Sequence, residues 1–170
     1  MDLTAHIRDI PDFPKPGIVF KDITPLLGNA AAFDASIVAL SKPYRGQSID
    51  AIVGIESRGF IFGAAVAREL GVGFVPIRKP GKLPADTISV SYALEYGEDT
   101  VEIHRDALSE GQSVVLLDDV LATGGTMAAA CELVDKTNAR VASLAFLVEL
   151  TFLGGRTKLD GYDIESILSF

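Results

Sequence analysis

Short runs of apolar residues alternate along this chain with longer segments in which apolar side chains recur at helical spacing. A short continuous apolar run is typical of a strand buried on both faces, whereas the longer periodic segments predict helices with one apolar face. The expected strands are 49–55, 72–77 (interrupted by Pro76), 113–117 and 141–150. The expected helices begin after a cap at Asn29, cover 57–70 up to Gly71, and cover 126–136. Strands that alternate with helices predict a single α/β domain over residues 1–170, in which helices flank a parallel sheet.

Three segments depart from this alternation. Residues 1–28 are rich in proline and predict an extended N-terminal arm or loop after a short helix at residues 3–9. Residues 87–108 alternate apolar and polar positions on both sides of Gly97, which predicts an inserted antiparallel hairpin. This hairpin is either an extension of the sheet edge or a lid over an active site, and the pattern favours neither. The last apolar segment, around Ile164 and Leu168, predicts an edge strand that completes the core.

The composition narrows the class of protein. Hydrophobic residues make up 48% of the chain, as expected of a folded domain. No run approaches the ~20 continuous apolar residues of a membrane helix. The first ten residues mix charged with apolar side chains and do not resemble a secretory signal, so the expected compartment is the cytoplasm. Cys131 is the sole cysteine and lies in an alanine-rich helical segment, which predicts a buried apolar position.

The charge distribution argues against a nucleic-acid partner. The chain carries a net charge of −8, and an acidic protein is repelled by nucleic acid unless it presents a basic patch. One short basic cluster is present, formed by Arg78, Lys79 and Lys82. This cluster suits a phosphorylated small molecule better than a duplex. We therefore expect small-molecule partners and neither nucleic acid nor membrane.

The segment 114–126 carries the strongest chemical signal in the sequence. Its apolar strand ends in two adjacent carboxylates, Asp118 and Asp119, and a loop of small residues then opens a helix. Glycines let backbone amides approach an anion closely, and the first turn of a helix supplies unpaired N–H donors. The segment therefore predicts a pocket for a terminal phosphate at the carboxyl end of a strand. The loop residues are Ala122, Thr123, Gly124, Gly125 and Thr126.

The two carboxylates indicate what lies beside that phosphate. Like charges repel, so Asp118 and Asp119 suit the neutral hydroxyl groups of a sugar, and they are also candidates for holding a hydrated Mg²⁺ ion. The alternative is a threonine-capped turn beside two exposed carboxylates, which a bare Thr-Gly-Gly-Thr sequence would favour. The loop lacks the Gly-x-x-x-x-Gly-Lys spacing of a Walker loop, which argues against hydrolysis of a nucleoside triphosphate.

The segment 118–126 closely resembles the phosphoribosyl-diphosphate-binding loop of type I phosphoribosyltransferases, in the form found in members that act on adenine. Four further segments are similar to that family and follow in its order: 13–24, 54–60, 77–84 and 92–97. The resemblance extends along nearly the whole chain. It implies the type I phosphoribosyltransferase fold, with the arm 1–28 contributing to a base pocket and the hairpin 87–108 as a lid.

The resemblance also implies roles for the matching residues. Ala122 to Thr126 would hold the 5-phosphate, and Asp118 and Asp119 the ribose hydroxyls. Val19 and Phe20 match the base pocket, where Phe20 can stack on adenine and Val19 can read its edge through the backbone. Without the phosphate loop, ordinary packing or solvation would explain most of these residues. Positions near the diphosphate are matched by Arg58, which also lies close to the base, and by Arg78, Lys79, Lys82 and Tyr96.

Glu95 matches the family's mobile hairpin and is the catalytic candidate. A carboxyl group that arrives with a closing lid can manage the proton on the imidazole side of adenine while the other ring nitrogen attacks the sugar carbon. The alternative for Glu95 is an exposed hairpin charge. Ala122 supplies no carboxylate at the loop position where relatives that act on 6-oxopurines carry an acid, which favours adenine.

The expected activity is transfer of the 5-phosphoribosyl group from 5-phospho-α-D-ribose 1-diphosphate to adenine, which gives AMP and diphosphate and serves purine salvage. The family implies Mg²⁺ bound to the substrate and a homodimer. One alternative is a different base, a 6-oxopurine or a pyrimidine, against which Ala122 and the pair Val19–Phe20 argue. The other is a regulatory protein that uses the loop as a ligand sensor. The acidic charge and the single-domain length argue against a regulator.

Overall fold

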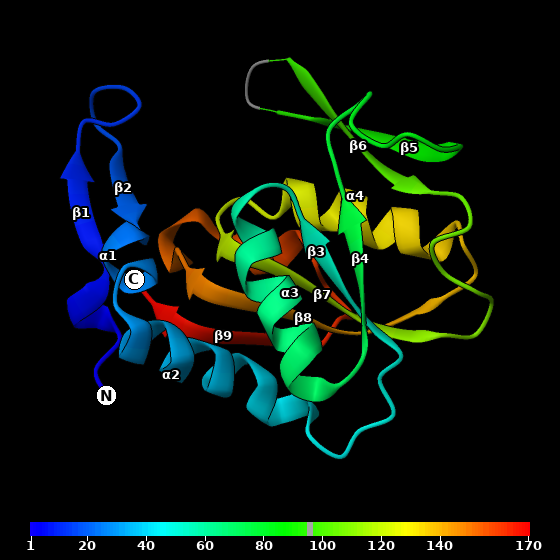
Figure 1. Ribbon diagram of the computed structural model, residues 1–170. Helices are drawn as coiled ribbons and strands as arrows, with labels where there is room; N and C mark the ends of the chain where they lie inside the picture. The colour runs from blue at the N-terminus through cyan, green and yellow to red at the C-terminus, as the bar shows by residue number, and fades with distance from the viewer. Residues whose placement is uncertain (95–96) are drawn as a thin grey trace.

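The computed structural model describes residues 1–94 and 97–170 and is built around a five-stranded sheet (Figure 1). All neighbouring strands in this sheet run parallel, as the alternating pattern predicts. Among the described residues, no helix combines the length and the apolar character needed to cross a membrane. In spatial order the strands are β4 (Gly73–Ile77), β3 (Ala51–Ile55), β7 (Ser113–Leu121), β8 (Arg140–Glu149) and β9 (Ile164–Ser169).

Helices cover both faces of the sheet, so the central strands are apolar on both sides. One face packs against α2 (Ala30–Ser41) and α3 (Arg58–Leu70), and the other packs against α4 (Gly125–Asp135) (Figure 1). Every residue of β3 is buried. Ile52 belongs to the core on the α2–α3 side, and its neighbour Val53 belongs to the core on the α4 side.

The predicted helix ends are confirmed within a residue or so. The side chain of Asn29 accepts a hydrogen bond from the amide of Ala32 at 3.0 Å and so caps α2. Gly71 adopts φ 72°, the left-handed conformation that commonly ends a helix, directly after α3. Cys131 lies buried in α4, and burial raises the pKa of its thiol to about 12. The expectation of a buried cysteine at an apolar position is therefore confirmed.

The predicted hairpin is present as a two-stranded antiparallel sheet of its own, formed by β5 (Thr87–Ala93) and β6 (Glu98–His104). Its inner side chains, among them Val90 and Val101, are buried in the same core as α4. The hairpin joins the end of β4 through the paired residues Arg78 and Glu102. In Figure 1 the hairpin lies above α4, which it contacts through both of its strands.

The N-terminal arm is more regular than the sequence predicts. A 3₁₀ turn at Thr4–His6 replaces the expected helix at residues 3–9. The strands β1 (Arg8–Pro11) and β2 (Val19–Asp22) then form an antiparallel ribbon, and α1 (Thr24–Leu27) follows. The arm is tied to the domain because Ile23 and Leu26 are fully buried. The proline-rich composition predicted an extended arm or loop, and the extended alternative is realised as a two-stranded ribbon. Such a ribbon tolerates Pro11, whose missing N–H can face its open side.

Two strand boundaries also differ from the prediction. Pro76 does not interrupt β4, because β4 is the edge strand and pairs only with β3 among the described strands. Strand β7 does not end at Asp118 but continues to Leu121, because Val120 and Leu121 still pair with β8. The two carboxylates therefore lie on the rigid end of a strand. The predicted C-terminal edge strand is confirmed as β9.

Candidate active site

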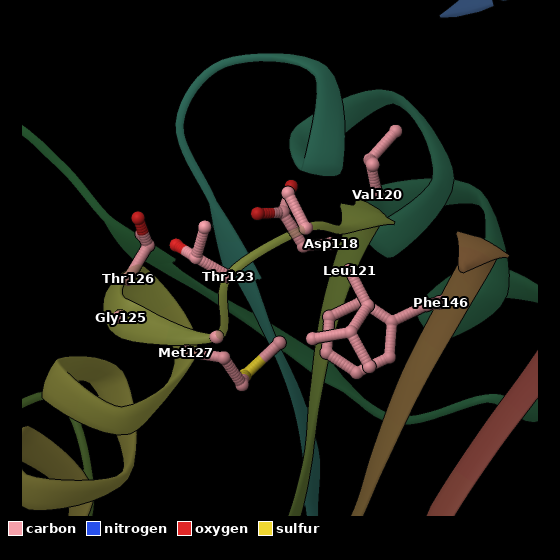
Figure 2. A pocket seen from close by; sticks show the side chains of 10 residues that line it. Asp118, Val120, Leu121, Thr123, Gly125, Thr126, Met127 and Phe146 are labelled. Carbon is pink, nitrogen blue, oxygen red and sulfur yellow. The ribbon is translucent and has the colours of Figure 1, made fainter. Parts of the chain in front are cut away.

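The phosphate loop lies at the carboxyl end of β7, where α4 begins. Gly124 precedes the first helical residue and adopts φ 81°, a conformation that side chains disfavour. The hollow beneath the loop has a volume of about 70 Å³. Figure 2 shows Asp118, Thr123 and Thr126 on its polar side, with apolar side chains below. The predicted loop residues thus surround one small concave site, whose apolar floor is formed by Leu121, Met127 and Phe146.

A second glycine turn braces this loop from behind. A Cβ atom at Gly124 would overlap the carbonyl oxygen of Gly155, and a Cβ atom at Gly155 would overlap that of Ala122. Backbone therefore packs directly on backbone at this point. Arg156, the next residue, is fixed by two hydrogen bonds of 2.7 Å to the carboxylate of Glu149. The compact segment after β8 thus supports the phosphate loop, a role that its sequence did not reveal.

A larger hollow of about 360 Å³ lies next to the loop and shares Asp118 and Ala122 with it. Val19 and Phe20 reach this hollow from strand β2 of the arm. The ring of Phe13 packs edge-on against the ring of Phe20, with centroids 5.2 Å apart. The structure therefore brings the predicted base-pocket residues beside the predicted ribose and phosphate residues. The remaining lining residues are Ile18, Lys21, Arg58, Asp119, Val120, Leu150 and Leu153.

Arg58 connects the aromatic arm to the carboxylates. Its guanidinium lies 5.0 Å from the centre of the Phe20 ring, and its Nε lies 2.8 Å from Oδ2 of Asp119. Helix α3 can approach this closely because residue 59 is glycine, where a Cβ atom would lie 2.8 Å from Oδ1 of Asp118. Arg58 therefore belongs to the site rather than to the outer surface.

The two adjacent carboxylates are held in an environment that disfavours their charge. Burial, and then the neighbouring charge of Asp119, raises the pKa of Asp118 well above its usual value. Burial likewise raises the pKa of Asp119, although the charge of Arg58 opposes the shift. Oδ2 of Asp119 forms an ion pair with Arg58, but among the described residues it accepts no hydrogen bond. Such an oxygen can accept a hydrogen bond from a hydroxyl group of a ligand.

We expect the charge of Asp118 to lower the stability of the free protein. Because its folded-state pKa is raised, the free energy of unfolding falls as pH rises from the ordinary carboxyl value towards the folded value. An Asp118→Asn variant keeps an oxygen to accept the 2.9 Å hydrogen bond from the Asp119 amide but loses the charge. Its melting temperature at pH 7 should rise by roughly 2–4 °C for a gain of about 1 kcal/mol.

The gain should disappear below about pH 4, where the native carboxyl is protonated in both states. Thermal denaturation monitored by circular dichroism across this range measures the effect. Asp160→Asn is the matched control, because it removes the charge of an exposed carboxylate. Equal melting temperatures for wild type and Asp118→Asn at pH 7 would show that burial of this charge carries no cost.

The basic cluster lies beside the site, but two of its three side chains are paired with acids. Arg78 forms an ion pair of 3.1 Å with Glu56, and Lys79 pairs with Asp99 of the hairpin. Burial alone would raise the pKa of Glu56, yet the hydrogen bonds from Arg78 and the Lys79 amide lower it. Neither hollow described above is lined by Arg78, Lys79 or Lys82.

The hairpin approaches the phosphate loop from the opposite side. Tyr92 of β5 shares a hydrogen bond of 2.9 Å with the hydroxyl of Thr126, and its ring lies against Gly125. A third hollow, of about 440 Å³, lies between hairpin and loop and is lined by Leu94, Thr123 and Lys158 among others. The predicted catalytic residue Glu95 and its neighbour Tyr96 lie outside the described residues.

Sequence reasoning missed several residues of this site. Leu150 and Leu153 line the larger hollow, and they follow β8 at the same edge of the sheet as the phosphate loop. Ligands bind at the carboxyl ends of parallel strands, so the position of these two leucines directly after a predicted strand could have identified them as site residues. Tyr92 and Asp99 were missed because the sequence around them does not indicate that Tyr92 contacts the phosphate loop or that Asp99 pairs with Lys79.

Comparison with known proteins agrees with this geometry. The family described as the phosphoribosyl transferase domain matches residues 24–165, which include the hairpin, the phosphate loop and the sheet up to the start of β9. The fold and the site are therefore those of the phosphoribosyltransferase class.

Similarity to individual proteins is closer and spans almost the entire chain. The adenine phosphoribosyltransferase of Thermoanaerobacter sp. (strain X514) is 61% identical over 99% of this chain and 98% of its own. The crystal structure of the enzyme from Thermoanaerobacter pseudethanolicus ATCC 33223 superimposes with a TM-score of 0.97 at 58% identity, covering 99% and 98% of the two chains. The chain belongs to the adenine phosphoribosyltransferase family.

A more distant relative adds information on ligands. The Saccharomyces cerevisiae adenine phosphoribosyltransferase, solved in complex with adenine and an imino-altritol bisphosphate, has a TM-score of 0.93 at 43% identity. The match covers 98% of this chain and 97% of the yeast chain. The fold is thus retained in a relative whose structure holds both a base and a sugar bisphosphate.

Proposed function

We propose that this protein transfers the 5-phosphoribosyl group from 5-phospho-α-D-ribose 1-diphosphate to adenine, giving AMP and diphosphate in purine salvage. One observation carries the proposal. At a single sheet edge, the phosphate loop, two carboxylates and a hollow lined by Phe20 and Arg58 lie side by side. These features match the phosphate, the diol and the base of one nucleotide. The names of the close relatives support adenine as the base.

In this proposal, different residues of the chain bind different parts of the two substrates. The amides and hydroxyls of Ala122 to Thr126 bind the 5-phosphate, and Asp118 and Asp119 accept hydrogen bonds from the ribose hydroxyls. Adenine lies in the hollow against Phe20, with the backbone of Val19 at its edge and Arg58 near both base and diphosphate. The arm 1–28 acts as part of the base pocket within one domain of residues 1–170.

The reaction exchanges one bond at the sugar carbon C1. A ring nitrogen of adenine forms the new bond as the bond from C1 to the diphosphate oxygen breaks, and that electron pair leaves with the diphosphate. Arg78, Lys79, Lys82 and Tyr96 stabilise the charge that develops there. Adenine loses its imidazole proton as the new bond forms, and the carboxylate of Glu95, on the hairpin 87–108 that acts as a lid, accepts this proton. Its chain neighbour Leu94 lines the hollow opposite Thr123, which supports this placement of the lid.

We also propose that the substrate is bound as its Mg²⁺ complex. Asp118 and Asp119 fit such an ion, because carboxylate oxygens are ligands that Mg²⁺ accepts. Oδ2 of Asp119 accepts no hydrogen bond from the described residues but pairs with Arg58, so the ion would share this oxygen with the guanidinium. The ion would neutralise charge on the departing diphosphate. Family membership further supports a homodimer acting in the cytoplasm. Size-exclusion chromatography with light scattering tests the dimer.

The decisive experiment is an end-point assay of diphosphate release with 5-phosphoribosyl diphosphate and Mg²⁺. Adenine, hypoxanthine, guanine, xanthine, orotate and uracil are supplied separately. Release with adenine alone, accompanied by AMP, is the expected result. Release with another base instead would overturn the interpretation of Ala122 and the aromatic arm. Binding of the diphosphate substrate without any base-dependent release would indicate a ligand sensor.

Loss of the aromatic ring at position 20 should weaken adenine binding. In a Phe20→Leu variant we expect the KM for adenine to rise roughly 5- to 100-fold, because stacking of a base on an aromatic ring contributes about 1–3 kcal/mol. The KM for 5-phosphoribosyl diphosphate should change little. Phe152→Leu is the control, since Phe152 is exposed and does not line the hollow. An unchanged KM for adenine in Phe20→Leu would place the base elsewhere.

A further inference from the structure

A continuous set of polar contacts runs from the phosphate loop to the basic cluster. The hydroxyl of Tyr92 lies 2.9 Å from that of Thr126 and donates a hydrogen bond of 3.1 Å to Oδ2 of Asp99. The same carboxylate oxygen pairs with the ammonium group of Lys79. These four residues come from α4, β5, β6 and the loop after β4. The hairpin is therefore linked at once to the loop that would bind the 5-phosphate and to a lysine that would bind the diphosphate.

The pair formed by Asp99 and Lys79 is ionised at neutral pH. Burial alone would raise the pKa of Asp99, but hydrogen bonds from Lys79, from the Thr100 amide and from Tyr92 lower it. Burial would likewise lower the pKa of Lys79, and Asp99 raises it instead. Both side chains are roughly one-third exposed, at 31% and 40%, so solvent and an incoming anion can reach them. The lysine charge is thus already neutralised by an internal anion.

An anionic ligand of Lys79 has to compete with this carboxylate. Asp99 is fixed from two further sides, by the Thr100 amide at 2.8 Å and by Tyr92, so it remains in place next to the lysine. A second anion beside Lys79 is repelled by Asp99 and shares the attraction of the lysine with it. This competition lowers the affinity of a ligand that carries a diphosphate, but not that of a ligand that carries the 5-phosphate alone.

We propose that Asp99 is a positioning residue that competes with the diphosphate for Lys79, and that Tyr92 holds it in that position. The inference depends on the proposed function, since it assumes that Lys79 contacts the diphosphate. Asp99 lowers the affinity of the protein for both the diphosphate-bearing substrate and the diphosphate product. It thereby favours product release at the expense of ground-state affinity.

The test compares two ligands by isothermal titration calorimetry, without adenine, on the full chain. The probes are Mg²⁺–diphosphate and ribose 5-phosphate. An Asp99→Asn variant keeps the shape of the side chain and removes its charge. We expect diphosphate to bind about three- to five-fold more tightly, the size typical of a partly exposed ion pair, and ribose 5-phosphate to bind as in wild type. Tyr92→Phe, which keeps the ring against Gly125, should tighten diphosphate binding in the same direction by about two-fold.

Two controls separate the specific contact from the general loss of negative charge. Glu98→Gln removes an equal charge from an exposed position on the same hairpin and should leave diphosphate binding unchanged. In a Lys79→Ala background, Asp99→Asn should tighten diphosphate binding clearly less than in the intact protein, because only the direct repulsion is then left to remove. Tightening of equal size with and without Lys79, or tightening that Glu98→Gln reproduces, would overturn the role of Asp99. A wild-type protein that binds neither probe would instead overturn the proposed function.

Discussion

A Gly124→Val variant is expected to lose all measurable binding of 5-phosphoribosyl diphosphate. Gly124 adopts φ 81°, and its missing side chain leaves room for the carbonyl oxygen of Gly155 behind the loop. A β-branched side chain would be strained at this φ and would force the loop away from Gly155. The loop amides, which we propose bind the 5-phosphate, would then be displaced from the site.

The appropriate control is Gly71→Val, at the end of α3. Gly71 also has a positive φ, of 72°, but a Cβ atom there would meet no atom within 4 Å. Both variants should lose stability by about 1–2 kcal/mol from backbone strain. Only Gly124→Val should lose ligand binding, measured by calorimetry at a temperature where both variants are folded. Full binding by Gly124→Val would contradict the assignment of the phosphate loop.

The second large effect is expected at Glu95. A Glu95→Gln variant should turn over roughly 10²- to 10⁴-fold more slowly, which is the usual contribution of a positioned acid or base. The affinity for 5-phosphoribosyl diphosphate should be retained, because the phosphate and ribose contacts come from the loop and the two carboxylates. Pre-steady-state measurement of AMP formation, together with calorimetry, separates the chemical step from binding.

Glu98→Gln provides the matched comparison for this prediction as well. It makes the same substitution on the same hairpin, where Glu98 begins β6 and is exposed. Its turnover should stay within about two-fold of wild type, as is usual for a surface substitution. If Glu95→Gln and Glu98→Gln are equally active, the proton is managed by another group, and the hairpin does not supply the acid or base.

The phosphate loop could be predicted from the sequence because every part of it is contiguous. Strand, carboxylates, small residues and helix follow one another within 114–126, and local backbone chemistry fixes their relation. In the secondary structure of this segment, the prediction placed the end of the strand too early. Strand β7 continues through Asp118 and Asp119 because β8 still pairs with it at Leu121. A strand boundary of this kind depends on the neighbouring strand, which local sequence does not identify.

The base hollow is harder to predict because its walls come from distant parts of the chain. Phe20 comes from the arm, Arg58 from the first turn of α3, and Leu150 and Leu153 from the segment after β8. The family resemblance indicated Phe20 and Arg58, but their contact with each other and with Asp119 requires the folded domain. Gly59 is an example: its lack of a side chain matters only because Asp118 lies against it.

By itself, the sequence determined the α/β class, the antiparallel hairpin, the helix caps at Asn29 and Gly71, and the order of strand, small-residue loop and helix within 114–126. These features depend on periodicity and on contacts between near neighbours in the chain. Only the tertiary structure decided that the proline-rich arm forms a ribbon, that Gly155 braces the loop and that Asp99 pairs with Lys79. Those contacts join residues far apart in the sequence. Their partners are selected by burial, charge and shape in the packed domain, none of which acts until the chain has folded.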